Sequence, residues 1–224
     1  MTLRTPLYDF HVAAGARIVE FAGWDMPLHY GSQIDEHNAV RTNAGVFDVS
    51  HMAVTDIAGR DALPFLRRLL ANDPDKLVDV GRAIYGVLLN DSAGIVDDLI
   101  VYRRANGYRA VTNAGTRERV LAHFNDVASA FAVDLVERRD LSILAIQGPH
   151  AIEKFERIAS LTDIHAMAAF TCVERNDCAQ GSVCLETPSG SVCGKVCNPD
   201  TDTACASSAC GYYVNFNGVA ICVP

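Results

Sequence analysis

Two adjacent aspartates, Asp97 and Asp98, lie inside an apolar run of the sequence, GIVDDLIVYRR at residues 94–104. A carboxylate in such surroundings can exchange protons with a substrate or stabilise a cationic intermediate. The flanking residues are mostly β-branched, aliphatic or aromatic, and they favour a β-strand. Side chains alternate between the two faces of a strand, so the two carboxylates are expected to point in opposite directions.

The apolar neighbours indicate that at least one of these carboxylates is buried. Asp97 shares a face with Leu99, and Asp98 shares the other face with Ile100. Burying even a neutral polar group without a partner costs about 2–7 kcal/mol, so a buried carboxylate implies hydrogen bonds, a cation or a bound ligand. The alternative is a strand that begins after a turn at residues 90–94 and keeps both aspartates near its solvent-exposed end.

The aspartate pair lies in the middle of three consecutive predicted strands, at residues 83–89, 95–104 and 108–113. The dipeptide Asn106-Gly107 between the last two favours a two-residue type I′ hairpin. A middle strand has a neighbour on each edge, which strengthens the case for burial of the pair.

The rest of the first 170 residues mixes helices with strands. Helices are predicted from Pro6 with Thr5 as N-cap, over 33–43 with Ser32 as N-cap, over 61–72 and 116–131, and from Gly148 onward. Further strands are predicted at 46–57, 133–137 and 142–146, and residues 17–30 are expected to form a loop with a short strand. This mixture, with at least one antiparallel hairpin, predicts the α+β class.

Composition limits the kinds of partner. Half of the 224 residues are apolar, which allows a substantial core, and the net charge of −8 argues against binding to a nucleic-acid backbone. No apolar run approaches the length needed to span a membrane. The first ten residues, MTLRTPLYDF, lack the apolar centre of a secretion signal, so this part of the chain is expected to be cytoplasmic.

Asp48, Ser50 and His51 suggest a hydrolase, but their spacing does not support one. Asp48 and Ser50 would share one face of a strand and His51 the other, so they cannot align as a catalytic triad. The remaining histidines of this part show no metal-ligand spacing, and we expect surface positions or satisfied core positions for His11, His29, His37 and His123. No metal site is predicted.

Long collinear stretches within residues 5–170 closely resemble the N-terminal part of the glycine cleavage system T-protein, an aminomethyltransferase. These stretches are TPLYDFHVAAGARIVEFAGWDMPLHYGSQIDEHNAVRTNAGVFDVSHM, AIYGVLLNDSAGIVDDLIVY, VTNAGTRERV and LSILAIQGPHA. The resemblance implies a folate-binding domain with tetrahydrofolate as co-substrate and H-protein as partner. Members of this family take an aminomethyl group from the lipoyl arm of H-protein, release ammonia and form methylenetetrahydrofolate.

The resemblance also assigns site residues. Asp98 matches the family's catalytic carboxylate, which hydrogen-bonds the reacting nitrogens of the folate. Met52, Tyr85 and Asn113 match positions that line the folate cavity. Ordinary core packing is the alternative for Met52 and Tyr85, and capping of the following helix is the alternative for Asn113.

The resemblance stops near residue 170. Family members continue there with a glycine-rich motif and a β-rich C-terminal domain, which help to hold the folate, and these segments are absent from this sequence. We therefore expect impaired aminomethyl transfer, because catalysis depends on positioning. A folate-binding fragment without catalysis is the alternative.

Residues 171–224 have a different composition, and we predict a boundary between a domain at 1–170 and a cysteine-rich tail. An even number of cysteines in a short segment rich in turn residues predicts a disulfide framework of four bridges. A zinc site is the weaker alternative, since the tail has no CxxC and no histidine. The tail resembles cysteine-rich, EGF-like repeats of secreted proteins, so a chimeric chain or a secreted interaction module stays open, and the tail suits an extracytoplasmic space. The candidate disulfide residues are Cys172, Cys178, Cys184, Cys193, Cys197, Cys205, Cys210 and Cys222.

Overall fold

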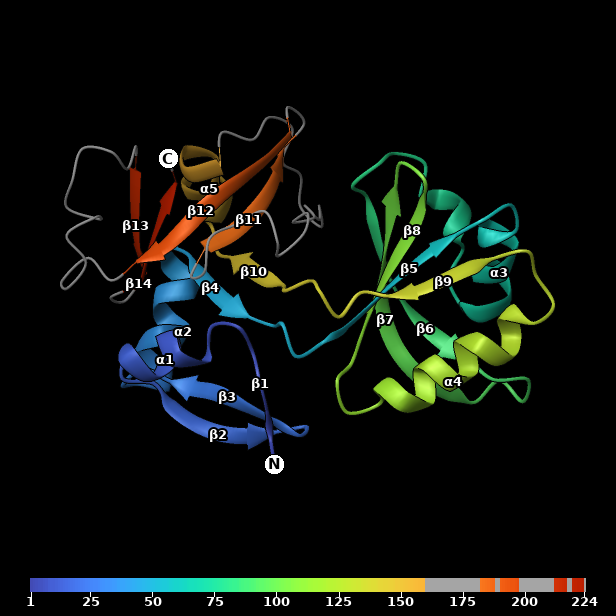
Figure 1. Cartoon of the computed structure of the whole chain (residues 1–224), viewed down its shortest axis with the longest axis horizontal. Coiled ribbons are helices and arrows are strands. Elements are labelled where there is room, and N and C mark those ends of the chain that lie inside the picture. Colours follow the sequence, from blue (N-terminus) through green and yellow to red (C-terminus); the bar gives the residue numbers. More distant parts are fainter. Residues whose placement is uncertain (160–181, 188–189, 198–211, 217–218, 224) are drawn as a thin grey trace. The chain divides into compact units, whose positions relative to one another are not determined.

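The structure is a computed structural model that describes residues 1–159, 182–187, 190–197, 212–216 and 219–223 (Figure 1). The chain folds as two compact units. Among the described residues, unit 2 comprises residues 52–139, and unit 1 comprises residues 1–51, 140–159 and the strands after residue 181. The sheets are mixed or antiparallel and pack with helices, which confirms the α+β class.

Unit 2 is built on a five-stranded antiparallel sheet with the strand order β6-β7-β8-β5-β9. The strand with the aspartate pair, β7, therefore has a neighbour on each edge, as predicted. The unit also contains two α-helices and a short 3-10 helix. The elements are β5 (Ala53–Ala58), α3 (Ala62–Leu69), η1 (Pro74–Lys76), β6 (Ala83–Leu89), β7 (Ile95–Arg104), β8 (Gly107–Thr112), α4 (Arg117–Ala128) and β9 (Asp134–Glu137).

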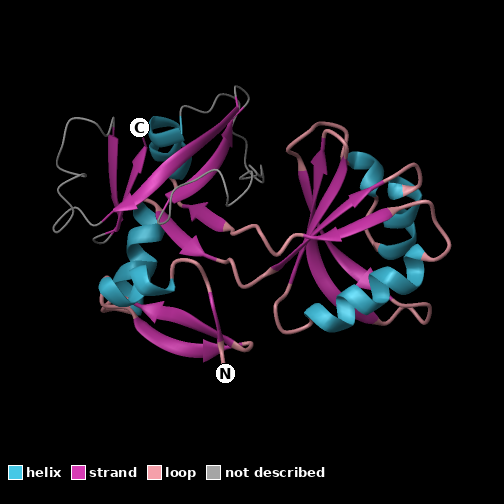
Figure 2. Ribbon diagram, in the orientation of Figure 1, coloured by secondary structure: helices cyan, strands magenta, loops and turns pink. Residues whose placement is uncertain are grey.

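Both α-helices of unit 2 pack on the same face of this sheet (Figure 2). Phe65 of α3 and Phe124 of α4 meet edge to face with ring centroids 6.1 Å apart, and both are almost fully buried. Leu99 and Val101 of β7 belong to the same core cluster. Because side chains alternate along β7, Asp98 lies on the opposite face, which these helices leave uncovered.

The described residues of unit 1 form three smaller sheets, with the strand orders β1-β3-β2, β10-β4 and β11-β12-β14-β13. The first is mixed, since β1 runs parallel to β3, and the other two are antiparallel. The helices are α1 (Tyr8–Ala13), α2 (Gln33–Thr42) and α5 (Ala151–Ala159). The strands are β1 (Leu3–Arg4), β2 (Arg17–Phe21), β3 (Trp24–His29), β4 (Gly45–Asp48), β10 (Leu144–Gln147), β11 (Ser182–Thr187), β12 (Gly190–Cys197), β13 (Tyr212–Phe216) and β14 (Val219–Val223).

Three local predictions were wrong. Residues 17–30 form a β2–β3 hairpin instead of a loop with a short strand, and the turn at Ala22-Gly23 has positive φ at both residues. The predicted strand 46–57 is broken into β4 and β5, because the chain passes from unit 1 to unit 2 there. Thr5 does not cap α1, whose N-cap is Leu7. The Ser32 cap is confirmed, since the backbone N–H of Asp35 donates to Ser32 Oγ at 3.2 Å.

The β7–β8 hairpin is confirmed, but its predicted turn is wrong by one residue. Arg104 pairs with Gly107, so the two loop residues are Ala105 and Asn106, and neither has the positive φ that a type I′ turn requires. Gly107 instead has φ +136°, and a Cβ there would lie 2.3 Å from the carbonyl oxygen of Ile57. The glycine is needed because β8 passes close to the backbone of β5.

The disulfide prediction concerns the tail and stays a prediction. Cys172, Cys178, Cys205 and Cys210 lie outside the described residues. The other four lie on described strands, where Cys184 of β11 faces Cys193 of β12 in register.

We expect Gly107→Ala to lower the free energy of unfolding by more than about 2 kcal/mol, because it combines an unfavourable φ with a backbone clash. Gly81→Ala is the matched control, since Gly81 has φ +87° but nothing within 4 Å of the added Cβ. The control should cost only about 1–2 kcal/mol. Equal losses for both variants in urea unfolding would contradict the close approach of β8 to β5.

Candidate functional site

Asp98 lies half-buried on the helix-free face of the sheet in unit 2, and its carboxylate is held by one side chain from strand β6 and one from the residue after β8. Tyr85 of β6 donates its hydroxyl to Asp98 Oδ2 at 3.0 Å. Asn113, directly after β8, donates its side-chain amide to Asp98 Oδ1 at 3.2 Å. A carboxylate offers about four acceptor positions, so each oxygen of Asp98 keeps capacity for a further donor.

The structure excludes core packing for Tyr85 and helix capping for Asn113. The Tyr85 residue is 58% exposed. The N-cap of α4 is Thr116, so the Asn113 side chain is free of that task. The hydrogen bond to Asp98 and the negative charge of Asp98 raise the pKa of Tyr85 above its ordinary value, so the Tyr85 hydroxyl stays protonated and acts as a donor near neutral pH.

Met52 is the fourth residue that the resemblance placed at the folate cavity. It is half-buried and immediately precedes β5. Ala53 and Thr112 are partners in the β5–β8 ladder, so Met52 and Asn113 each lie one residue beyond this pair. The backbone of Met52 therefore lies beside that of Asn113, whose side chain donates to Asp98.

Asp97 is the buried member of the aspartate pair, with 8% of its surface exposed. Asn113 Nδ2 donates to Asp97 Oδ1 at 3.1 Å, and Thr116 Oγ1 donates to Asp97 Oδ2 at 2.5 Å. The sequence indicated that a buried carboxylate here would need partners, but it did not identify Thr116. The spacing of Asn113 and Thr116 across the β8–α4 connection was the available signal.

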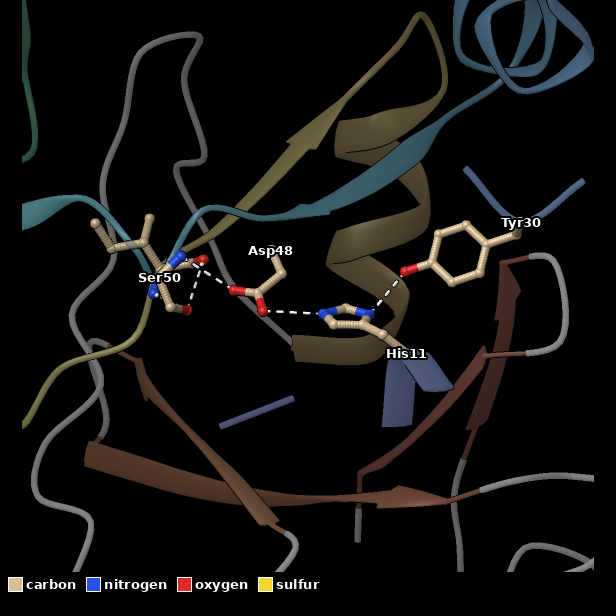
Figure 3. A network of polar contacts seen from close by, with 5 residues as sticks. His11, Tyr30, Asp48 and Ser50 are labelled. Atoms are coloured by element: carbon tan, nitrogen blue, oxygen red, sulfur yellow. Dashed lines mark hydrogen bonds and ion pairs between the residues drawn. The ribbon is translucent and has the colours of Figure 1, made fainter. Parts of the chain in front are cut away.

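A second polar network lies in unit 1 (Figure 3). His11 Nε2 lies 3.0 Å from Asp48 Oδ2, and His11 Nδ1 lies 2.7 Å from the hydroxyl of Tyr30. An ionised carboxylate only accepts hydrogen bonds, so in the neutral ring Nε2 donates to Asp48 and Tyr30 donates to Nδ1. The Asp48 and His11 side chains are only 1% and 7% exposed. The sequence predicted His11 as a satisfied core or surface group and missed both of its partners.

Burial, hydrogen bonds and neighbouring charges shift the pKa values of Asp48 and Tyr30 in this network. Burial raises the pKa of Asp48, but hydrogen bonds from His11 and Ser50 outweigh burial and hold that pKa below its ordinary value. Burial and the charges of Asp48 and Glu36 raise the pKa of Tyr30 to about 12. The network therefore contains an ionised carboxylate and a neutral phenol at neutral pH.

The geometry supports the rejection of a hydrolase triad. The Ser50 hydroxyl is paired with the backbone of Ile143, from which it accepts at 3.0 Å and to which it donates at 3.3 Å. The histidine on Asp48 is His11, while the His51 ring packs edge-on against Phe21 with centroids 5.6 Å apart. Ser50 therefore links the chain just after β4 to the chain just before β10, and no histidine among the described residues serves it as a base.

Within the part of the chain that the structure describes, no three His, Cys, Asp or Glu side chains are grouped to hold a metal ion. No helix in the same residues is long and apolar enough to cross a membrane.

Comparison with known proteins gives consistent matches. Residues 7–185 match the family model described as the GCVT N-terminal domain. An aminomethyltransferase of Alcanivorax borkumensis is 60% identical over 151 residues, which cover 67% of this chain and 42% of that protein. An aminomethyltransferase of Legionella pneumophila strain Paris is 50% identical over 175 residues, which cover 78% of this chain and 49% of that protein.

A solved structure agrees with the sequence matches. The crystal structure of glycine cleavage system aminomethyltransferase T from Bartonella henselae superposes with a TM-score of 0.69 at 33% identity. The superposition covers 84% of this chain and 50% of that chain. The chain thus spans about half the length of the curated relatives it matches.

We expect Asp48→Ala to lower the free energy of unfolding of unit 1 by about 1–3 kcal/mol, because His11 and the Ser50 amide would lose a buried acceptor. Fluorescence of Trp24, the single tryptophan of the chain, reports on this unit during urea unfolding. The control is Asp9→Ala on the exposed side of α1, with a cost below about 1 kcal/mol. Equal losses of unfolding free energy for Asp48→Ala and Asp9→Ala would contradict a stabilising role of this network.

The lowered pKa of Asp48 also gives a pH dependence. A carboxyl whose pKa is lower in the folded state contributes stability at pH above its unfolded pKa of about 3.9, and this contribution disappears as the pH falls through the folded value. The stability difference between the unaltered chain and Asp48→Asn should therefore shrink below about pH 4. A difference that is the same at pH 3 and pH 7 would show that the Asp48 charge contributes nothing.

Proposed function

We propose, because the chain belongs to the GCVT N-terminal domain family, that it carries the folate-binding site of a glycine cleavage aminomethyltransferase. The proposed substrates are tetrahydrofolate and the aminomethyl group on the lipoyl arm of H-protein. The observation that carries the proposal is the half-exposed Asp98 carboxylate, held by Tyr85 and Asn113 on the helix-free face. Residues 1–170 are the proposed folate-binding domain, and residues 171–224 are the proposed separate tail.

In the proposed reaction, the aminomethyl carbon forms two bonds to nitrogens of tetrahydrofolate. Its bonds to the lipoyl sulfur and to the amino group break, and the two protons of the folate nitrogens leave with the thiol and with ammonia. Asp98 would accept hydrogen bonds from the folate nitrogens and orient them towards the carbon. Tyr85 and Asn113 each occupy one position on the carboxylate, and this fixes the direction in which its remaining lone pairs point.

Asp98, Tyr85 and Met52 also suit a cationic intermediate. A carboxylate next to the aminomethyl carbon stabilises positive charge that develops when ammonia leaves. Tyr85 is exposed enough to contact a ligand over the same face, and Met52 would add an apolar contact near Asn113.

We expect Asp98→Asn to weaken tetrahydrofolate binding by about 10- to 100-fold, which corresponds to the loss of a hydrogen bond to a charged group. Isothermal titration calorimetry measures this directly. The matched control is Asp126→Asn, an exposed aspartate of α4 that should leave the affinity unchanged. Equal affinities for Asp98→Asn and the unaltered chain would remove Asp98 from the site.

A transfer assay separates catalysis from binding alone. Aminomethyl-loaded H-protein and tetrahydrofolate are mixed with the chain, and ammonia and methylenetetrahydrofolate are measured. Formation of both products supports the transferase, whereas binding without products supports the folate-binding fragment. The proposed function is overturned if the chain shows no binding and forms no products at saturating tetrahydrofolate.

A further inference from the structure

The structure assigns to Asp97 the task of a positioning residue: we propose that it holds the Asn113 amide so that its NH₂ group faces Asp98. Asn113 Nδ2 lies 3.1 Å from Asp97 Oδ1, 3.2 Å from Asp98 Oδ1 and 3.3 Å from the backbone oxygen of Asp98. One amide nitrogen therefore donates to two adjacent residues whose side chains leave the strand on opposite faces.

The position of Asn113 makes this possible. The β7–β8 ladder ends at the pair Leu99 and Thr112, so Asn113 lies one residue beyond the ladder, level with Asp98. There the chain leaves the sheet towards α4, and the Asn113 side chain reaches around the end of the ladder to the buried Asp97.

The Asn113 amide carries an acceptor oxygen and a donor NH₂ group, and Asp97 determines which of the two faces Asp98. If the amide turned over, its oxygen would face both carboxylates, and acceptors would repel each other. Asp98 is half-exposed and is the residue that a ligand would approach. Asp97 is buried, so its hold on the amide is shielded from water and from the ligand.

Thr116 fixes Asp97 in turn. Its hydroxyl donates to Asp97 Oδ2 at 2.5 Å, and it makes no side-chain cap on α4 although it occupies the N-cap position. Helix N-caps usually employ a threonine hydroxyl for their own backbone N–H groups. Here the hydroxyl is used on Asp97, which ties the β8–α4 connection to the strand that carries Asp98.

The consequence for ligand binding rests on the proposed function, in which Asp98 contacts tetrahydrofolate. Asp97→Ala removes the buried acceptor of the Asn113 amide and leaves the amide held by Asp98 alone, so it should weaken tetrahydrofolate binding about tenfold. Asp97→Asn can present its own oxygen to Asn113 and its NH₂ to Thr116 Oγ1, so it should stay within about threefold of the unaltered chain.

A purely structural role for Asp97 is tested with Val120→Ala. Val120 is a fully buried residue of α4 in the core cluster, so its truncation destabilises the same unit. The truncation keeps the hydrogen bond from the backbone N–H of Val120 to the carbonyl oxygen of Thr116, and it removes no donor from the aspartate pair. If Asp97→Ala and Val120→Ala lower the melting temperature similarly, only Asp97→Ala should lose affinity. Equal affinities for the two variants would overturn the proposal. If Asp97→Ala does not fold, Thr116→Val against Thr116→Ser makes the same comparison, with loss of affinity expected for Thr116→Val.

A second readout does not depend on the ligand. The two side-chain amide protons of Asn113, assigned in ¹⁵N spectra with an Asn113→Ala variant, should exchange slowly with water in the unaltered chain, in Asp97→Asn and in Val120→Ala. Asp97→Ala should accelerate their exchange at least about tenfold. Unchanged exchange would overturn the proposal. If the unaltered chain binds no tetrahydrofolate, the proposed function fails, and this measurement alone decides on Asp97.

Discussion

The site in unit 2 depends on one constraint: two ionisable carboxylates follow each other on a strand that belongs to an apolar sheet. Alternation along β7 puts Asp97 towards the core and Asp98 on the helix-free face. Asn113 donates to both, and this shared donor links the interior of the unit to its exposed surface. The burial of Asp97 is tolerable because two side chains donate to it, and the same contacts order the residues beside Asp98.

The fold supplies this arrangement through its topology. In the order β6-β7-β8-β5-β9, the strands on either side of β7 are its sequence neighbours, so Tyr85 and Asn113 reach Asp98 from opposite sides. The two α-helices both pack on the other face and leave the carboxylate accessible. Unit 1 shows the contrasting use of a polar network. There Asp48 and His11 are almost fully buried, and the contacts of His11 with Asp48 and Tyr30 join α1 to β4 and to the residue after β3.

Much of unit 2 follows from the sequence, because its strands are long and locally encoded. The predicted bounds of β6 and β7 agree with the structure, and the opposite directions of the two aspartates follow from alternation alone. The errors lie where long-range contacts decide. Residues 46–57 have a continuous strand pattern, but the chain changes units there. Gly107 is required by the backbone of β5, which the local turn pattern does not contain. Likewise, Thr116 and the partners of His11 are brought into place only by tertiary packing.

The central claim is that a folate approaches the helix-free face at Asp98, and a crystal structure of the chain with bound tetrahydrofolate tests it most directly. We expect the folate nitrogens to lie about 2.6–3.2 Å from the Asp98 carboxylate, with Tyr85 and Asn113 still in place on its two oxygens. A ligand bound on the helix-covered face, in unit 1, or beyond hydrogen-bonding distance of Asp98 would contradict it.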